Sequence, residues 1–350
     1  MGAQEIPQDI DSASWMHDRP WIDHPDADVD AYVASLKQRP AYDLSAKLKS
    51  WQQNGFVIFE KAVSDADIEG YLDDIAVLMR DFEQYRIGIE VRGKQLISSD
   101  LDGFPADLTG VKLNHMHCFS RHAAKLSLTP HVTDFLGHVF RNPASVCQSL
   151  TFWRGSEQLV HIDYPYVRQQ SPLSYLAASW IPLEDVDPDS GPLGYYPGAH
   201  KVDRSGFFDW GDGAIVQLEQ AKRTPAEFSR YLRERMSSLG IERQVFCPKR
   251  GDVLLWHGNL PHEGTTVNNP ALTRKSYVTH YTAERALPDW MRNHDDLGRP
   301  IGVFENGAYC YRSKWFDADP VLPSWTTPRR SGLSRVTSAL RALKRRLAGG

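Results

Sequence analysis

The hydrophobic residues of the first third of the chain predict helices that lead into a strand. Residues 45–54 contain good helix formers and are followed by Gly55, a residue type that commonly ends helices. The run 56–59 that follows, Phe-Val-Ile-Phe, is typical of a strand. A second helix is predicted after Ser64, because a Ser-x-x-Asp cap precedes apolar residues that recur every three or four positions: Ile68, Leu72, Ile75 and Met79.

The pattern changes near residue 145. Up to there, residues 120–140 give a further helical pattern that Pro130 interrupts. Beyond it, short runs rich in Val, Thr, Phe, Tyr and Trp alternate with glycine and proline clusters, at residues 146–152, 175–183, 253–256 and 276–282. These runs are too many and too short for an α/β alternation. We therefore predict a mainly β fold with flanking helices (α+β), whose core is a jelly roll or related barrel.

Local composition divides the 350 residues into three parts. Residues 1–44 are rich in Asp, Pro and Trp without periodicity, and we expect an arm with at most local structure. Residues 45–320 are predicted to form a single domain, with its β core at about 145–285 and a polar, partly helical insertion at about 204–240. Residues 321–350 are predicted to form a basic C-terminal tail.

The tail and the body have opposite charge. Seven of the 40 Lys and Arg residues lie in 329–350 without an acid, which leaves 33 bases against 44 acids before them. The apolar residues of the tail recur at helical spacing, so the tail predicts a basic amphipathic helix. Such a helix can contact a membrane surface or a partner, dock on the acidic body, or stay a flexible terminus. Its apolar stripe consists of Leu333, Val336, Leu340, Leu343 and Leu347.

Overall composition is that of an ordinary globular protein, with 41% hydrophobic and 24% charged residues. No apolar run is long enough to span a bilayer, and the first residues, MGAQEIPQDID, lack the features of a signal peptide. The four cysteines are scattered without zinc or disulfide spacing. We therefore expect a cytoplasmic protein, and a pI near 6.4 gives no reason to expect nucleic-acid binding.

Two histidines and a carboxylate are the ligands of non-haem iron enzymes, which leave coordination positions open for cosubstrate and oxygen. The sequence form is His-x-Asp with a distant second histidine. Among 13 histidines, about one such motif is expected by chance, and three occur, beginning at His24, His161 and His294. Only His161 and Asp163 lie between β-rich segments with candidate partners downstream.

The second histidine is predicted to come from the segment 251–264, a turn and an apolar strand that end before a loop. His257 and His262 both lie there. Because they are five residues apart, they face opposite sides of a regular strand, so only one is expected to reach the metal. We favour His262, which precedes a turn and lies 12 residues before Arg274. His257 is then a structural histidine.

Arg274 and Ser276 complete the pattern. A cosubstrate such as 2-oxoglutarate chelates iron at one end and leaves a free carboxylate at the other, which a guanidinium can bind. The two residues share strand parity, so both can point inward and hold that carboxylate.

On these residues, the segment from about 45 to 285 resembles the phytanoyl-CoA dioxygenase family of Fe(II)- and 2-oxoglutarate-dependent oxygenases. The stretch 48–58, LKSWQQNGFVI, resembles the opening helix and strand of that family, and 190–201, SGPLGYYPGAHK, resembles its glycine-proline turn, with Ala199 where serine is usual. The resemblance implies a double-stranded β-helix (jelly roll, cupin-like) fold. It also implies His161, Asp163 and His262 as iron ligands and Arg274 as the 2-oxoglutarate contact.

The resemblance further implies that Gln148 contacts the cosubstrate, although a cross-strand or surface glutamine is an equal alternative. His200 is interpreted as structural, and Tyr164 and Arg168 are either substrate contacts or rim residues. The expected reaction uses O2 to hydroxylate an unactivated carbon of a small molecule, with release of succinate and CO2. Desaturation, epoxidation or ring closure are alternative outcomes, and a non-catalytic jelly-roll ligand-binding protein is the alternative class. No basic cluster for a CoA diphosphate lies near the motifs, which favours a secondary-metabolite-like substrate.

Overall fold

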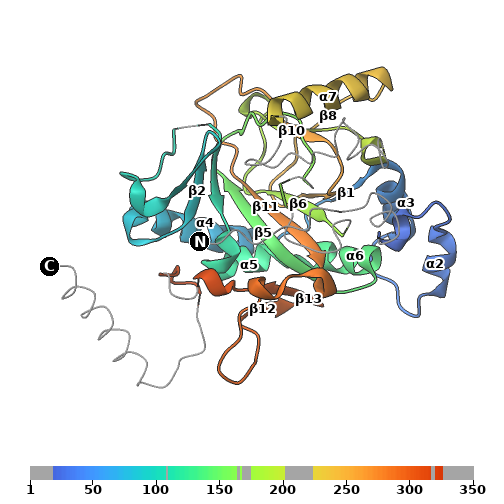
Figure 1. Cartoon of the computed structure of the whole chain (residues 1–350), viewed down its shortest axis with the longest axis horizontal. Helices are drawn as coiled ribbons and strands as arrows, with labels where there is room; N and C mark the ends of the chain where they lie inside the picture. Colours follow the sequence, from blue (N-terminus) through green and yellow to red (C-terminus); the bar gives the residue numbers. More distant parts are fainter. Residues whose placement is uncertain are drawn as a thin grey trace.

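Two β-sheets form the centre of the computed structural model, which describes residues 19–107, 109–163, 166–167, 175–201, 224–316 and 320–325 (Figure 1). The small sheet has the order β10 (His262–Gly264), β7 (Leu193–Tyr195), β8 (Gln244–Phe246). The large sheet runs through β1 (Phe56–Phe59), β9 (Val253–His257), β6 (Ala177–Pro182), β11 (Ser276–Ala283), β5 (Ala144–Phe152), β4 (Val111–Asn114), β2 (Gly88–Val91) and β3 (Lys94–Ile97).

The ends of the helices follow the capping residues in the sequence. Gly55 ends α3 (Leu44–Asn54) with a φ of 80°, a left-handed conformation that glycine adopts without strain. The Ser64 side chain accepts from the Asp67 backbone and begins α4 (Asp65–Arg80). Pro130 separates α5 (Arg121–Ser127) from α6 (Pro130–Phe140) at the first position of α6, where its missing N–H is tolerated. The predicted helices and the mainly β core are thus confirmed.

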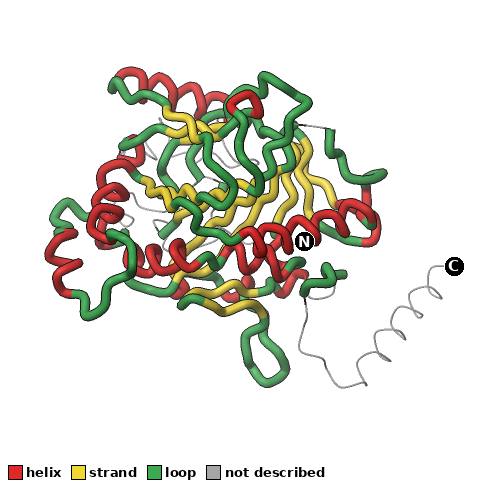
Figure 2. Tube along the Cα trace, turned by 180° about the vertical axis from the view of Figure 1, so that it is seen from behind, coloured by secondary structure: helices red, strands yellow, loops and turns green. Residues whose placement is uncertain are grey.

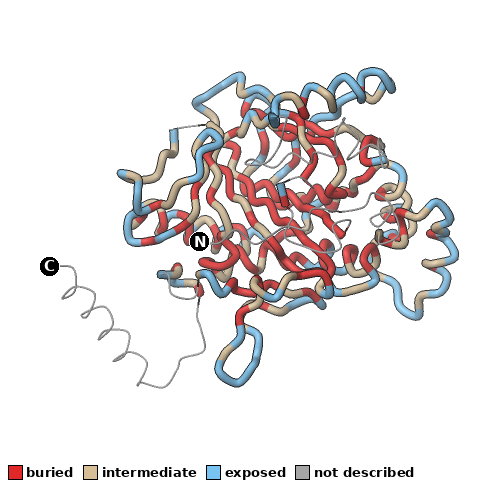
Figure 3. The backbone as a smooth tube through the Cα atoms, in the orientation of Figure 1, coloured by how far each residue is buried: buried red, intermediate tan, exposed pale blue. Residues whose placement is uncertain are grey.

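Alternate residues of β5 and β11 face two different environments. On the outer face, the Ser127 hydroxyl lies 2.9 Å from the Tyr277 hydroxyl and 3.0 Å from the Thr279 hydroxyl, so α5 packs against β11. Figure 2 shows helices lying across this side of the large sheet, and Figure 3 shows that the central strands are buried. The other face points towards the small sheet, and it carries Gln148, Leu150, Phe152, Val278 and His280.

Helix α7 (Pro225–Ser238) lies beside the small sheet, at the top of Figure 1. It begins with a capping box, in which Thr224 and Glu227 satisfy each other's backbone N–H groups. Its apolar residue Phe228 packs against Ile162, between the two residues of the His-x-Asp motif. The helix belongs to the insertion expected at about 204–240, of which residues 204–223 lie outside the described part.

Packing continues across both expected domain boundaries. Within the segment expected to be an arm, α2 (Val29–Ser35) forms, and Ile22 and Val29 are buried in the main core. At the other end, Leu322 and Trp325 are buried in the same core. The amphipathic helix predicted for the tail lies outside the described residues. Within the described part of the chain, no helix is long and apolar enough to cross a membrane.

Two further strands, β12 (Gly302–Glu305) and β13 (Ala308–Tyr311), form a hairpin that was not predicted. Tyr309 of β13 pairs with Ser145 of β5 in a parallel bridge, which adds the hairpin to the large sheet. The turn between them is Asn306-Gly307, with φ of 53° and 72°, a typical hairpin signal that the strand pattern used above did not include.

Candidate metal centre

His161 and His262 are held together by their own backbones. His161 N–H donates to the His262 carbonyl at 3.0 Å, and His262 N–H donates to the His161 carbonyl at 2.9 Å. This antiparallel bridge puts both side chains on one side, with ring centroids 4.3 Å apart. The sequence preference for His262 over His257 therefore agrees with the geometry.

Asp163 completes a cluster of three possible ligands. Its backbone N–H donates to the Gly258 carbonyl at 3.0 Å, which places the carboxylate beside both rings. Asp163 Oδ1 lies 3.5 Å from His262 Nε2 and 4.0 Å from His161 Nε2. The three ligand atoms lie within 4.8 Å of one another, and no other such group of His, Cys, Asp or Glu occurs among the residues that the structure describes.

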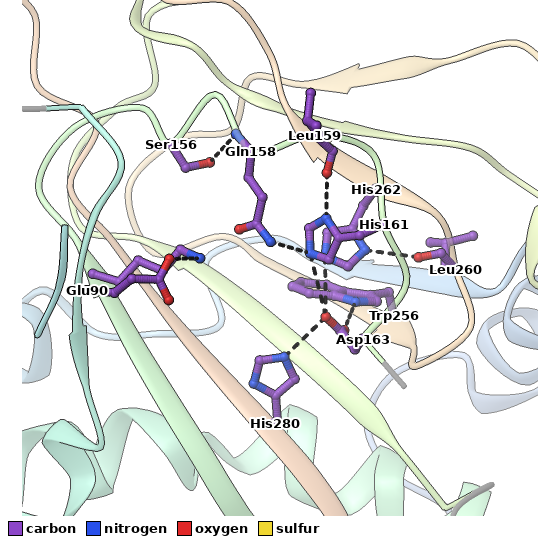
Figure 4. A network of polar contacts seen from close by, with 11 residues as sticks. Glu90, Ser156, Gln158, Leu159, His161, Asp163, Trp256, Leu260, His262 and His280 are labelled. Atoms are coloured by element: carbon purple, nitrogen blue, oxygen red, sulfur yellow. Dashed lines mark hydrogen bonds and ion pairs between the residues drawn. The ribbon is translucent and has the colours of Figure 1, made fainter. Parts of the chain in front are cut away.

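Backbone carbonyls fix the orientation of both imidazoles. His161 Nδ1 lies 2.8 Å from the Leu159 carbonyl, and His262 Nδ1 lies 2.9 Å from the Leu260 carbonyl (Figure 4). A carbonyl accepts only, so each Nδ1 carries the proton and each Nε2 keeps its lone pair. Hydrogen bonding of the second ring nitrogen is the usual arrangement of metal-binding histidines.

The protonation states also suit a cation. Burial, reinforced by the neighbouring His262, lowers the pKa of His161 to about 3, so this imidazole is neutral at physiological pH. Burial alone would raise the pKa of Asp163, but His262, His280 and His161 outweigh it and keep the carboxylate ionised. Two imidazoles and one carboxylate on one face, with open space beyond, are the donor set expected for non-haem Fe(II).

A cavity of about 300 Å³ opens between the two sheets at this cluster. Arg274 lines it and is only 2% exposed, with its guanidinium 5.6 Å from the Phe152 ring and 5.5 Å from the Trp180 ring. Burial lowers the pKa of Arg274 to about 10, which still leaves it charged. Its Nε has no hydrogen-bond partner, and no described carboxylate lies within ion-pair distance of it. A buried, unpaired guanidinium needs an anion, so the cavity can hold a carboxylate there.

The other expected cosubstrate contacts differ in position. Gln148 lines the cavity and pairs with His280 across β5 and β11. Ser276 is fully buried and its hydroxyl has no partner, but it is not among the residues that line the cavity. Ser276 lies opposite Phe152, a residue of the cavity lining, so its contact with the cosubstrate stays a prediction.

The remaining candidate residues lie elsewhere. His257 Nε2 is 3.1 Å from Asp23 Oδ2, which supports the interpretation of His257 as structural. His200 is buried, 5.3 Å from His257 between ring centroids. The other two His-x-Asp motifs, at His24 and His294, do not line the cavity. Tyr164 and Arg168 lie outside the described residues.

Three residues at the site were missed by sequence reasoning. Trp256 Nε1 donates to Asp163 Oδ2 at 2.8 Å, and His280 Nε2 lies 3.4 Å from Asp163 Oδ1 (Figure 4). Gln158 Nε2 lies 3.1 Å from His161 Nε2. His280 could have been predicted, because it lies an even number of residues from Arg274 and so points to the same face of the strand. Trp256 and Gln158 carried no signal of this kind.

The arrangement corresponds to one class of protein, the double-stranded β-helix oxygenases that depend on non-haem Fe(II) and 2-oxoglutarate. A model of the phytanoyl-CoA dioxygenase (PhyH) family matches residues 51–276, so the chain belongs to that family. The predicted family, fold and enzyme class are thus confirmed.

Two curated relatives are similar to this chain over most of their length. Both are called phytanoyl-CoA dioxygenase domain-containing protein 1 homolog. The protein from Caenorhabditis elegans is 21% identical over 286 residues, which are 71% of this chain and 93% of the relative. The one from Caenorhabditis briggsae is 20% identical over 277 residues, 70% and 93% of the two chains.

Among solved structures, EctD from S. alaskensis with bound Fe is similar to this chain in fold. Its TM-score is 0.50 at 17% sequence identity, and the match covers 76% of this chain and 83% of EctD. The likeness supports the β-helix assignment.

Proposed function

We propose that the protein hydroxylates an unactivated carbon of a small molecule, with Fe(II) bound by His161, Asp163 and His262. Arg274 binds the far carboxylate of 2-oxoglutarate in this proposal. The observation that carries it is the convergence of two imidazole Nε2 atoms and one carboxylate oxygen in the same cavity as a buried guanidinium without an anionic partner.

The chemistry of the residues present fits the proposed groups. When bound, Fe(II) with 2-oxoglutarate and O2 supplies an oxidant strong enough to attack an unreactive C–H bond. Leu159 and Leu260 carbonyls orient the two imidazoles, and the Trp256 indole holds Asp163 Oδ2 so that Oδ1 faces the rings. Arg274 fixes the direction in which the cosubstrate lies, and the apolar side chains around it exclude water.

Halogenation needs a halide at the coordination position of the carboxylate, and Asp163 supplies a carboxylate there. Hydroxylation is therefore favoured over halogenation. Desaturation, epoxidation and ring closure start from the same site, so product analysis decides among them. A jelly-roll protein that binds a ligand without turnover is the other candidate, and the unpaired charge of Arg274 in a cavity would serve a bound anion there too.

The decisive experiment adds Fe(II) and 2-oxoglutarate to the protein without oxygen. The oxygenase should give a visible metal-to-ligand charge-transfer band, and oxygen should then yield succinate. Asp163→Ala and His262→Ala should each abolish both signals. His294→Ala, in an exposed His-x-Asp motif, is the control and should keep them. A wild-type band in either ligand variant would refute the assignment.

A further inference from the structure

Strands β2, β3 and β4 continue the large sheet beyond the β-helix and form a wall of the cavity. In the cross-strand register, Glu90 lies opposite both Gln95 and Lys112, and Lys112 lies opposite Phe152 of β5. Residues directly opposite one another in antiparallel strands project to the same face. The side chains of Gln95, Glu90 and Lys112 therefore lie on the same face of the sheet as Phe152, whose ring is next to Arg274. All four residues line the cavity.

The charges of this wall cancel one another. Lys112 Nζ lies 2.9 Å from Glu90 Oε1, and their side chains are only 12% and 18% exposed. Gln95 Nε2 donates to the second oxygen, Glu90 Oε2, at 2.7 Å, and Asn114 Nδ2 donates to Gln95 Oε1 at 3.1 Å. The ion pair is therefore held in place by two amides, and it offers a ligand no net charge.

The other carboxylates that line the cavity also have partners or an assigned role. Glu263 Oε1 lies 3.0 Å from Arg243, and Oε2 lies 2.9 Å from Arg233. Asp163 belongs to the metal centre, and Arg274 is assigned to the cosubstrate. Among the described lining residues, no carboxylate, lysine or arginine is left to neutralise a charged substrate.

Amide side chains supply the unused hydrogen-bonding capacity. Gln148 makes no side-chain hydrogen bond with any described residue, and neither does the carbonyl oxygen of Asn114 or Gln158. The Gln158 N–H group now faces His161 Nε2, whose lone pair a metal would take, so metal binding would release that donor as well. Amides both donate and accept, which matches hydroxyl groups, because these do the same.

We infer that the substrate is an uncharged molecule with several hydroxyl groups, recognised by the amides of Asn114, Gln148 and Gln158 beside the self-neutralised Glu90–Lys112 pair. The inference rests on the proposed function, since it places this molecule next to the metal and the cosubstrate. A cavity of about 300 Å³ that also holds the cosubstrate admits only a small part of a large molecule, so the hydroxyl groups lie near the reacting carbon.

Three probes of similar size and hydroxyl content separate the effect of charge. Myo-inositol is neutral, D-gluconate is anionic and D-glucosamine is cationic. Each is titrated calorimetrically into the full chain loaded with Fe(II) and 2-oxoglutarate without oxygen, and the visible band is followed in parallel. We expect myo-inositol to bind at least tenfold more tightly than either charged probe. Tighter binding of a charged probe, or binding of none at millimolar concentration, would overturn the inference.

Matched variants locate the binding. Gln148→Leu should weaken myo-inositol binding by about tenfold, the loss of one or two hydrogen bonds, and leave the Kd for 2-oxoglutarate unchanged. A raised Kd for 2-oxoglutarate would instead assign Gln148 to the cosubstrate. Gln53→Leu, on the exposed side of α3, is the control and should leave binding unchanged. Glu90→Gln uncovers the charge of Lys112 and should make D-gluconate the preferred probe. Unchanged preference in Glu90→Gln would also contradict the inference.

The two proposals fail in different ways. If Fe(II) and 2-oxoglutarate give no visible band, the proposed function fails. If the band forms and myo-inositol neither binds nor shifts it, only the substrate class is wrong.

Discussion

The indole N–H of Trp256 donates to Asp163 Oδ2 at 2.8 Å, while Asp163 Oδ1 faces the two histidines. The two residues lie 93 positions apart, and both are buried. A carboxylate held by one oxygen presents the other in a fixed direction, which prepares it to bind a cation.

Trp256→Phe should therefore weaken metal binding by about 10- to 100-fold, since outer hydrogen bonds to metal ligands commonly contribute this much. The ring remains, so the protein should still fold. Calorimetric titration with Fe(II) or Co(II) measures the change. Trp180→Phe, which also alters a tryptophan of the cavity, should keep wild-type metal affinity, and an equal loss in both variants would assign the effect to packing.

Arg274→Gln should raise the Kd for 2-oxoglutarate by at least about 100-fold, because a buried charge-assisted pair is lost. Arg274→Lys keeps the charge without the planar fork, so it should restore only part of the affinity. The titrated visible band gives both values. The neighbouring Lys275, paired with Glu184 at 3.0 Å, provides the control Lys275→Gln, which should bind the cosubstrate normally.

His115 makes the stability depend on acidity. Burial, with a smaller effect of His280, lowers its pKa from 6.5 to about 4. As the pH falls below about 6.5, His115 becomes protonated in the unfolded chain, whereas in the folded chain it stays neutral until about pH 4. Acid therefore favours unfolding. In that window, this group lowers the free energy of unfolding by up to about 1.4 kcal/mol per pH unit.

His115→Asn should reduce the slope of the free energy of unfolding against pH, by an amount that corresponds to at most one proton. Asparagine suits the position, because His115 has a φ of 58° and asparagine tolerates the left-handed region. Urea unfolding of the metal-free protein between pH 7 and 5 measures the slope. Above pH 7.5 the slopes of the two proteins should be equal, and an unchanged slope at pH 5–6 would contradict the role of His115.

Glu263 ties α7 to the strand that carries His262. Its carboxylate contacts Arg233 of α7 and also Arg243, and the Tyr196 hydroxyl donates to it at 3.1 Å. Glu263→Gln should speed hydrogen exchange in Pro225–Ser238 and lower overall stability modestly. The carboxylate is only 5% exposed, but the arginines are 53% and 46% exposed, so water partly screens both ion pairs. Glu234→Gln, an exposed change on the same helix, should leave exchange unaltered.

Local sequence signals predicted local structure well. The cap at Ser64, the glycine at Gly55 and the proline at Pro130 each mark a helix end where the structure has one. Strand parity placed Arg274 in the cavity, and the turn after the strand favoured His262 over His257.

Contacts between distant strands could not be predicted in this way. The wall made by Glu90 and Lys112 depends on the pairing of β2 with β4 and of β4 with β5, which no local pattern specifies. The same holds for Trp256, whose partner Asp163 lies beyond a long stretch of chain. The burial of Ile22 and Leu322 likewise depends on where the ends of the chain meet the core.

The cavity wall made by Glu90 and Lys112 and the proposed metal ligands come from separate stretches of the chain, 88–114 and 161–262. Grafting a different β2–β4 segment onto this scaffold should thus change part of the surface that contacts the substrate, while Gln148, Gln158 and the proposed metal ligands stay in place. One side of the proposed substrate pocket is therefore open to exchange, by evolution or by engineering, independently of the proposed metal ligands.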